Sequence, residues 1–373
     1  MPKKNTRGSS SSKSSVHEML AKHEDRRQSL LNEYPQEEKF WDCCAPALPF
    51  IVMFVLGSIF SANISFLLKA ILLLCLYIVY AKYVCDERVI SIDPVYIYLA
   101  TKFWMYIVWF IYIMSSVPIL DTIIFVSWSL VLWYNFLRAW KVDPGVIIVS
   151  EDERCEMIMN LLEQGGLDST LVCTTCMIRK PLRSKHCADC DRCVARFDHH
   201  CEWLSNCVGW KNHKFFVGYL FSLVVMCVIF LHGAVKFMRK NCDLECSFVE
   251  VVSCEPWITF MSLQGVVHGF WVLGLLIGQL IQILWLGLTT NERLNWARYA
   301  KRYGAGNGSG RMQLSTHSNP GVVKNFIDFF ELECFGSDKT DWMRVFNQPR
   351  NQEESSVDSQ PLISDKPDDF HNV

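Results

Sequence analysis

Between residues 173 and 207 the chain reads Cys173-Thr-Thr-Cys176, then His186-Cys187-Ala-Asp-Cys190-Asp-Arg-Cys193, then Asp198-His199-His200-Cys201, and closes with Cys207. This short segment holds seven of the 17 cysteines of the chain, together with three histidines. Cys-x-x-Cys pairs followed closely by histidine and further cysteines are typical of tetrahedral zinc sites, because zinc prefers thiolate and imidazole ligands. The segment therefore predicts bound zinc.

A count of ligands extends this prediction. Two closed tetrahedral sites use eight ligands, whereas the segment offers ten cysteines and histidines. One thiol and one imidazole are left over, with Asp198 close by in the sequence. A spare cysteine beside a spare histidine and a carboxylate is the arrangement of an activated nucleophile. Spacing alone does not say which cysteine is spare, and a purely structural zinc scaffold with one unused buried thiol satisfies the same count.

The segment resembles the DHHC family of protein S-acyltransferases, the palmitoyltransferases, whose pattern is C-x2-C, basic-Pro-x-Arg, H-C-x2-C-x2-C, D-H-H-C and N-C-V-G. Every spacing agrees here, at Cys173–Cys176, Lys180–Arg183, His186–Cys193, Asp198–Cys201 and Asn206–Gly209. The resemblance implies two structural Zn²⁺ ions and the ligands of each. One set is Cys173, Cys176, His186 and Cys193, and the other is Cys187, Cys190, His200 and Cys207.

The same resemblance implies a function for the residues left over. Cys201 is expected to be the nucleophile, His199 its base, and Asp198 the group that orients the histidine. The expected acyl donor is palmitoyl-CoA or another long-chain acyl-CoA. The expected acceptors are cytosolic-facing proteins with membrane-proximal cysteines. The family usually has proline after the catalytic cysteine, whereas this chain has Glu202, whose negative charge disfavours a neighbouring thiolate.

Composition favours a membrane protein. Hydrophobic residues make up 51% of the chain and charged residues 20%, and the mean hydropathy is +0.16. The net charge of −2 gives no reason to expect nucleic acid as a partner. Basic residues nevertheless gather in the cysteine-rich segment. They are either a solvated surface that faces anionic lipid headgroups or a site for the phosphates of coenzyme A, with Lys180 and Arg183 as the first candidates.

Six apolar runs are long enough to cross a bilayer, which takes about 20 residues in a helix. They are Ala45–Ala62, Ser65–Tyr83, Tyr96–Val117, Leu120–Phe136, Phe215–Phe237 and Val266–Leu288. Lys69 and Lys102 fall inside these runs, near enough to an end for the ammonium group to reach the interface. We therefore predict an all-α integral membrane protein with six transmembrane helices and a cytosolic two-zinc domain between the fourth and the fifth.

The distribution of lysine and arginine predicts the topology. The short links at Asn63 and Ser115-Ser116 lack basic residues, so the positive-inside rule places both termini and the cysteine-rich domain in the cytosol. The external loop after the fifth span then holds Cys242, Cys246 and Cys254, two of which could form a disulfide. The predicted organisation is a disordered cytosolic tail (1–44), transmembrane helices 1–4 (45–140), the zinc domain (141–214), helices 5–6 (215–290), a cytosolic region (291–350) and an acidic disordered tail (351–373).

Three short motifs outside the zinc segment also resemble the family: Asp143-Pro144-Gly145, Thr289-Thr290-Asn291-Glu292 and the stretch around Asn325. The first two are expected to pack the zinc domain against the membrane helices. The six-span layout resembles the huntingtin-interacting branch, which carries N-terminal ankyrin repeats, yet no 33-residue repeat precedes the first span. Asp358 to Ile363 has the form of an acidic dileucine sorting signal, in keeping with a Golgi or other endomembrane location.

These observations predict an S-palmitoyltransferase that passes a long acyl chain from acyl-CoA to protein cysteines through an acyl-enzyme at Cys201. The alternative is a membrane adaptor of weak or no activity that keeps the zinc fold and binds partners through it. Glu202 and the missing ankyrin repeats are the features that favour the adaptor.

Overall fold

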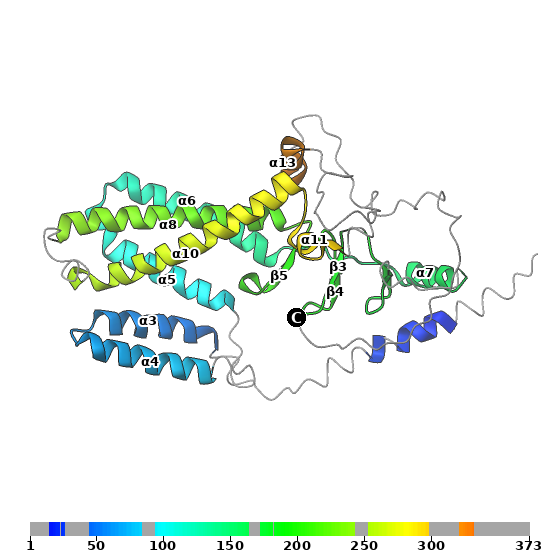
Figure 1. The fold of residues 1–373 in the computed structure, drawn as a ribbon, viewed down its shortest axis with the longest axis horizontal. Coiled ribbons are helices and arrows are strands. Elements are labelled where there is room, and N and C mark those ends of the chain that lie inside the picture. The colour runs from blue at the N-terminus through cyan, green and yellow to red at the C-terminus, as the bar shows by residue number, and fades with distance from the viewer. Residues whose placement is uncertain are drawn as a thin grey trace, which may run out of the picture. The chain divides into compact units, whose positions relative to one another are not determined.

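The computed structural model describes residues 15–22, 24–26, 45–83, 94–163, 172–181, 183–242, 253–297 and 321–331 (Figure 1). The predicted acidic tail and its sorting signal lie outside these residues. Long helices make up most of the described chain, and its strands occur only as short hairpins in the cysteine-rich segment.

Four helices are long and apolar enough to cross a membrane. They are α5 (Pro94–Ile111) with the 3-10 turn Ile113–Ser116, α6 (Ile119–Lys141), α8 (His213–Asn241), and α10 (Pro256–Leu280) with the π-helix Ile281–Leu286. The last span begins at Pro256, ten residues before the predicted start. Proline fits the first turn of a helix, where its missing N–H is not needed, so the helix starts there although polar residues follow it.

The first two predicted spans form a pair of shorter apolar helices, α3 (Leu48–Ser61) and α4 (Phe66–Tyr83). Helix α3 packs against α5 and α10 as well as against α4 (Figure 1). Stacked tryptophans fill its contact with the other helices: Trp104 of α5 lies 5.4 Å from Trp257 of α10, between ring centroids. Four of the six predicted spans are thus helices of spanning length, and spans one and two stay a prediction.

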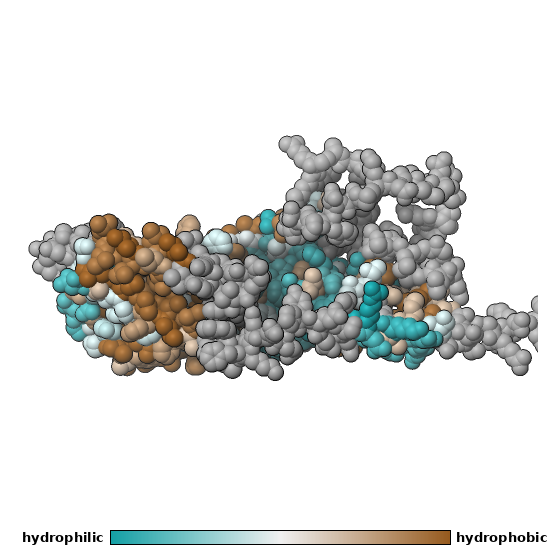
Figure 2. Space-filling view, turned by 90° about the horizontal axis from the view of Figure 1, so that it is seen from below, coloured by the Kyte–Doolittle hydropathy of each residue, from teal (hydrophilic) through white to brown (hydrophobic). Residues whose placement is uncertain are grey.

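Aromatic side chains form the core between the remaining helices. The rings of Trp109 and Phe125 stack 3.9 Å apart, and both side chains are fully buried. The outer faces of the helices are apolar too, with Ile119, Phe270 and Trp271 more than two-thirds exposed. Figure 2 shows this apolar surface as a brown area over the helices, in contrast to the hydrophilic residues elsewhere. A surface of this kind is suited to lipid rather than to water.

One lysine is not where the sequence led us to expect it. Lys102 does not reach the interface: it lies within α5 with 5% of its surface exposed, so that prediction was wrong. The side chain is held inward, where it contacts Met105 and the ring of Tyr98. Lys69 of α4, by contrast, is partly exposed, and its Nζ donates to the carbonyl oxygen of Phe60.

A disulfide joins Cys242, at the end of α8, to Cys254, just before α10. The sequence offered three cysteines for this bond, and residue 246 lies outside the described residues. The bond links the end of α8 to the start of α10, although the two cysteines are 12 residues apart in the sequence.

The cysteine-rich segment folds into three antiparallel hairpins. They are β1 (Val172–Cys173) with β2 (Ile178–Arg179), β3 (Lys185–Cys187) with β4 (Arg192–Val194), and β5 (His199–Cys201) with β6 (Asn206–Val208). The register pairs His186 with Cys193 and His200 with Cys207. The hairpins therefore set candidate metal ligands opposite one another, and the all-α prediction missed them because each strand is only two or three residues long.

A helix occupies residues 15–22 of the segment that was predicted to be disordered. Its Val16 and Leu20 are buried against Cys155 and Ile158 of α7 (Glu151–Glu163). The spacing of Val16 and Leu20 puts both on one helical face. The prediction of disorder is wrong for this stretch, because two apolar residues within a polar tail are enough to dock it.

The cysteine-rich segment is fastened to the end of α10 by a buried ion pair. Arg183 donates from Nε and Nη2 to the two carboxylate oxygens of Glu292, both at 2.6 Å, and from Nη2 to the carbonyl oxygen of Gly287. Glu292 is 1% exposed and closes a capping box with Thr289 at the start of α11 (Thr290–Leu294). Arg183 is therefore engaged in holding the fold, and its role as a contact for coenzyme A phosphates stays a prediction.

The two other motifs make similar contacts. Asp143 accepts the backbone N–H groups of Gly145 and Val146 and pairs with Lys211. Gly209 approaches this turn so closely that a Cβ would lie 2.6 Å from the carbonyl oxygen of Pro144. On α13 (Val322–Phe330), Asn325 donates to the carbonyl oxygen of Leu284 in the π-helix. All three motifs thus join the cysteine-rich segment or α13 to the membrane helices.

We predict that Glu292→Gln destabilises the fold by about 3 kcal/mol, because it leaves the Arg183 guanidinium buried without its counter-charge. Thermal unfolding of the detergent-solubilised protein measures the effect. Lys211→Gln is the matched control: it breaks the exposed pair with Asp143, for which we expect less than about 1 kcal/mol. Equal losses for both variants would contradict a special role for the buried pair.

Candidate active site and metal centres

Two groups of four side chains bring metal-binding atoms together. The first consists of Cys173, Cys176, His186 and Cys193, and the second of Cys187, Cys190, His200 and Cys207. Within each group all ligand atoms lie within 4.8 Å of one another. These groups contain the same residues as the two sets implied by the family resemblance, and both can hold a metal ion.

The donor atoms fit zinc in both number and spacing. Each group offers three sulfurs and one imidazole nitrogen, a set that occurs in structural zinc sites. Tetrahedral bonds of about 2.3 Å to sulfur and about 2.0 Å to nitrogen place neighbouring ligand atoms roughly 3.5–3.8 Å apart. The structure has Cys187 Sγ 3.6 Å and Cys207 Sγ 3.7 Å from His200 Nδ1, and Cys176 Sγ 3.3 Å from His186 Nδ1.

Within the described part of the cysteine-rich segment, the thiol outside both groups is that of Cys201. It lies at the end of β5, next to His200 of the second group, and is buried. On one side the imidazole of His199 lies beside the Cys201 thiol, which helps to raise the pKa of that imidazole. On the other side its Nδ1 lies 2.7 Å from Oδ2 of Asp198. Among the described residues, the structure thus brings Asp198, His199 and Cys201 into one connected chain of polar contacts.

Asp198 is held by a network that reaches into the membrane helices. Its Oδ1 accepts the backbone N–H of Thr290 at 2.7 Å, and its Oδ2 accepts the Thr290 hydroxyl at 2.9 Å. Gln279 of α10 donates to the same Oδ2 at 3.1 Å, and its own oxygen lies 2.9 Å from Nε2 of His213. The carboxylate is 1% exposed, yet every contact is with a hydrogen-bond donor. A buried anion is stable under these conditions.

The network sets the charges of Asp198 and His199. Burial alone raises the pKa of Asp198, but the neighbouring His213, the hydrogen bond to His199 and the Thr290 N–H lower it well below its usual value. Burial lowers the pKa of His199, whereas its hydrogen bonds to Asp198 and Cys201 outweigh that effect and raise it to about 9. His199 is therefore an imidazolium that lies between the Asp198 carboxylate and the Cys201 sulfur.

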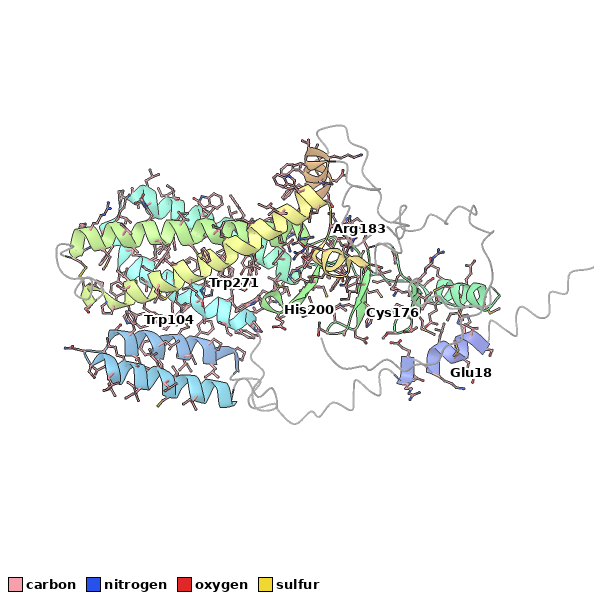
Figure 3. All side chains as sticks on the ribbon, viewed as in Figure 1. Glu18, Trp104, Cys176, Arg183, His200 and Trp271 are labelled. Atoms are coloured by element: carbon pink, nitrogen blue, oxygen red, sulfur yellow. A yellow bond between two sulfur atoms is a disulfide. The ribbon has the colours of Figure 1, made fainter. Side chains whose placement is uncertain are left out.

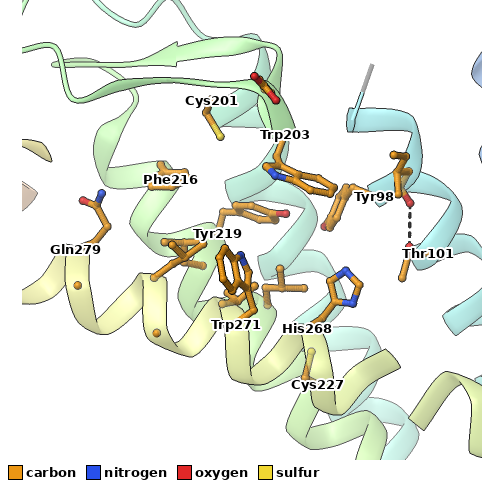
Figure 4. A pocket seen from close by; sticks show the side chains of 18 of the residues that line it. Tyr98, Thr101, Cys201, Trp203, Phe216, Tyr219, Cys227, His268, Trp271 and Gln279 are labelled. Atoms are coloured by element: carbon orange, nitrogen blue, oxygen red, sulfur yellow. Dashed lines mark hydrogen bonds between the residues drawn. The ribbon is translucent and has the colours of Figure 1, made fainter. Parts of the chain in front are cut away.

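Cys201 opens onto a cavity of about 730 Å³ between α5, α8 and α10 (Figure 4). The part next to the thiol is lined by large apolar and aromatic side chains, among them Tyr98, Phe216, Tyr219 and Leu223. Trp203, from the 3-10 turn after Cys201, also lines the cavity. Figure 3 places Trp104 and Trp271 among the helices, and Cys176, Arg183 and His200 in the cysteine-rich region. The thiol therefore stands where the polar segment meets the apolar helices.

Some functional contacts escaped the sequence analysis. Gln279 and His213 carry the Asp198 network, but no motif marks them. The usable signal is a polar side chain near the end of an otherwise apolar run, which is costly in a membrane unless it has a partner. Lys180 is partly exposed and remains a candidate contact for phosphate, and Glu202 is exposed.

Comparison with known proteins gives one family. Residues 167–297 match the family model described as DHHC palmitoyltransferase. The palmitoyltransferase Hip14 of Drosophila melanogaster is 36% identical over 357 residues, which cover 92% of this chain and 55% of the relative. Palmitoyltransferase ZDHHC17 of Danio rerio is 40% identical over 320 residues, which cover 83% of this chain and 51% of the relative. Palmitoyltransferase ZDHHC13 of Homo sapiens is 33% identical over 316 residues, which cover 79% of this chain and 49% of the relative.

The chain spans about half the length of the curated relatives that it matches. Within that half, the matched segment contains both four-residue metal groups and the Asp198–His199–Cys201 contacts. The sequence pattern, the geometry and the comparisons agree, and the chain belongs to the DHHC palmitoyltransferase family.

Proposed function

We propose that this protein is an S-palmitoyltransferase that moves a long acyl chain from acyl-CoA to cysteine thiols of membrane-associated proteins. The observation that carries the proposal is the position of Cys201. Its thiol belongs to neither metal group, contacts His199, and faces an apolar cavity large enough for an alkyl chain. The names of the relatives support the same activity.

The first step loads the enzyme. His199 holds the proton of Cys201 as an imidazolium, and the Cys201 thiolate attacks the carbonyl carbon of the thioester. The bond from that carbon to the sulfur of coenzyme A breaks, and the departing thiolate of coenzyme A takes the proton from His199. Asp198 keeps Nδ1 of His199 occupied at 2.7 Å, so that Nε2 is the nitrogen available to exchange the proton.

The second step transfers the chain. A substrate cysteine gives its proton to His199 and attacks the acyl carbonyl, and Cys201 leaves as a thiolate that is then protonated. One thioester is exchanged for another in each step, so the energies of reactant and product are nearly equal. Burial of the chain in the cavity contributes about 0.8 kcal/mol for each methylene group. This burial favours long acyl chains over short ones.

The metal groups would hold zinc as a structural ion, because all four ligands in each come from the protein. We assign Cys173, Cys176, His186 and Cys193 to one ion and Cys187, Cys190, His200 and Cys207 to the other. Zinc bound there supplies cross-links between hairpins that have almost no apolar core of their own. The ligand His200 lies next to Cys201, so the second ion would also fix the backbone that presents the nucleophile.

The proposed reaction also implies a membrane topology, because the acyl chain belongs in lipid and coenzyme A in water. We propose that α3 and α4 complete a six-span bundle in a Golgi or related membrane. Both termini and the cysteine-rich segment then lie on its cytosolic side. The basic ends of α6 and α8 fit this topology only in part: Arg138 and Lys141 end α6 on the cysteine-rich side, but Arg239 and Lys240 end α8 on the other. Lys180 is our candidate for the phosphates of coenzyme A.

We predict that Cys201→Ser abolishes acylation that hydroxylamine can reverse, because a serine ester resists hydroxylamine and the hydroxyl is a poorer nucleophile. The purified protein is incubated with alkynyl palmitoyl-CoA, and the label and the zinc are measured. We expect zinc to stay at two per chain. Cys75→Ser, at an exposed position on α4, is the control that keeps its label. Loss of zinc from Cys201→Ser would make Cys201 a ligand. Absence of label from the wild type with zinc intact would favour the adaptor.

Cys187→Ser should act through folding instead. Losing one of four ligands removes much of a binding free energy that is also folding free energy. We expect loss of one zinc, a lower melting temperature and, as a consequence, little acylation. Cys155→Ser removes a buried cysteine of α7 that belongs to neither group, and it should keep both ions. A stable Cys187→Ser protein with both ions would refute our ligand assignment.

Glu202 is expected to have a small effect, because an exposed charge is screened by water and salt. Glu202→Gln should raise the rate of loading by about twofold to threefold at low salt, and the gain should shrink at high salt. Glu202→Pro should add to it, since proline is tolerated at the first position of the 3-10 turn Glu202–Leu204 and stiffens the backbone beside Cys201. The same rate for all three proteins at every salt concentration would show that this carboxylate has no part in the chemistry.

A further inference from the structure

The cavity changes in character with distance from Cys201. Near the thiol its walls combine the polar groups around Asp198, among them Gln279 and Thr290, with aromatic and aliphatic side chains, and the stretch that follows is mainly apolar. Further in, they carry Lys102 of α5, Cys227 of α8, and Gln264 and His268 of α10. Figure 4 shows Cys201 at one end of the cavity and His268 and Cys227 at the other, with Tyr98 and Tyr219 between them. A hydrocarbon chain needs no polar partner at this depth.

Distances along α8 and α10 place Cys227 and His268 at the same depth in the cavity, measured from the residues that contact His199 and Asp198. On α8, the ring of Phe216 lies 5.2 Å from that of His199, and Cys227 follows eleven residues later, about 16 Å along the helix. On α10, Gln279 contacts Asp198, and His268 precedes it by eleven residues, again about 16 Å. The two helices touch here, since a Cβ on Gly269 would lie 3.2 Å from that of Cys227.

Lys102 lacks a strong acceptor. Its Nζ lies 3.9 Å from the thioether sulfur of Met105 and 5.7 Å from the centre of the Tyr98 ring. Among the described residues no carboxylate comes within ion-pair distance of it. Thioether sulfur is a weak acceptor, and an amine buried in a membrane protein without a better one is costly. The side chain is 5% exposed, so bulk water does not supply the missing partner.

Gln264 lacks a donor. Its Oε1 is buried without a hydrogen-bond partner in the part of the chain that the structure describes, although Nε2 approaches the sulfur of Met53 at 3.7 Å. One turn further on α10, Nδ1 of His268 lies 3.2 Å from the backbone oxygen of Gln264. Lys102 is therefore a donor without a strong acceptor in the cavity wall, and Gln264, about 6 Å beyond His268 along α10, has a buried acceptor that no described donor reaches.

We propose that this inner end is a polar subsite for an acyl chain that carries a hydroxyl group near its far end. A hydroxyl both accepts and donates, so it can take a hydrogen bond from Lys102 and give one to Gln264. An extended alkyl chain advances about 1.3 Å per carbon, so about 13 carbons cover the distance from the thioester. The ligand is thus a hydroxylated acyl-CoA of about 14 to 16 carbons. The inference rests on the proposed acyltransferase function.

The test compares palmitoyl-CoA with 16-hydroxypalmitoyl-CoA as donors. Loading of Cys201 is followed by the mass of the intact, zinc-loaded protein in detergent. We expect the wild type to load the hydroxylated chain about tenfold faster, the effect of one or two additional hydrogen bonds. Lys102→Met removes the donor without removing length, and its ratio of rates should fall to about one or below. Lys102→Gln keeps a shorter donor and should restore part of the preference.

Thr101→Val is the matched control. Thr101 is next to Lys102, but its hydroxyl already donates to the backbone oxygen of Ile97 at 2.9 Å (Figure 4). Its removal should leave the ratio of rates unchanged. If Lys102→Met does not fold, Gln264→Leu serves in its place, since it deletes the acceptor from another helix. A ratio that is the same in the wild type and in Lys102→Met would overturn the subsite.

A binding measurement separates this inference from the proposed function. Each CoA thioester is added in turn, and the rise in melting temperature of the protein is recorded for the wild type and for Lys102→Met. Larger stabilisation by the hydroxylated thioester, lost in Lys102→Met, supports the subsite even if Cys201 loads neither donor, an outcome that would refute only the acyltransferase. Loading of both donors at equal rates, with equal stabilisation, would refute only the subsite.

Discussion

The buried carboxylate of Asp198 is the interaction on which the site depends. It accepts hydrogen bonds from the Thr290 backbone and hydroxyl and from Gln279, and it holds His199 at 2.7 Å. Three donors from the end of α10 and the start of α11 are needed to keep this charge away from water. The same contacts therefore stabilise the anion, orient the histidine and fix the cysteine-rich segment on the membrane helices.

The cysteine-rich segment depends on these attachments because it is too small to be stable by apolar burial. Its hairpins have two or three residues to a strand, and its two small apolar clusters consist largely of the candidate metal-ligand cysteines. Metal ions in the two groups would hold the hairpins together, and the Arg183–Glu292 pair and the Asp198 network join them to the apolar helices. Both kinds of attachment would fix the backbone that presents Cys201, as the proposed nucleophile requires.

The cavity joins this polar site to the lipid phase. Beyond the polar groups around Cys201 its walls are mainly apolar, and polar side chains return about 16 Å further in. A charged or hydrogen-bonding residue within a membrane is expensive, so Lys102 and Gln264 are unlike the tryptophans and leucines that make up the rest of the bundle. Their unmet hydrogen-bonding groups point to a ligand rather than to packing.

The sequence by itself determined what depends on short spacings. Cys-x-x-Cys pairs and neighbouring histidines predicted two metal groups, apolar runs predicted the long helices, and the D-H-H-C segment predicted the family. Tertiary structure alone decided what depends on contacts between distant residues. Arg183 meets Glu292 from over a hundred residues away, so its apparent availability for phosphate could not be judged from its neighbours. Gln279 became part of the site, and Lys102 part of the cavity, only when α5, α8 and α10 packed together, because burial is a property of the assembled bundle.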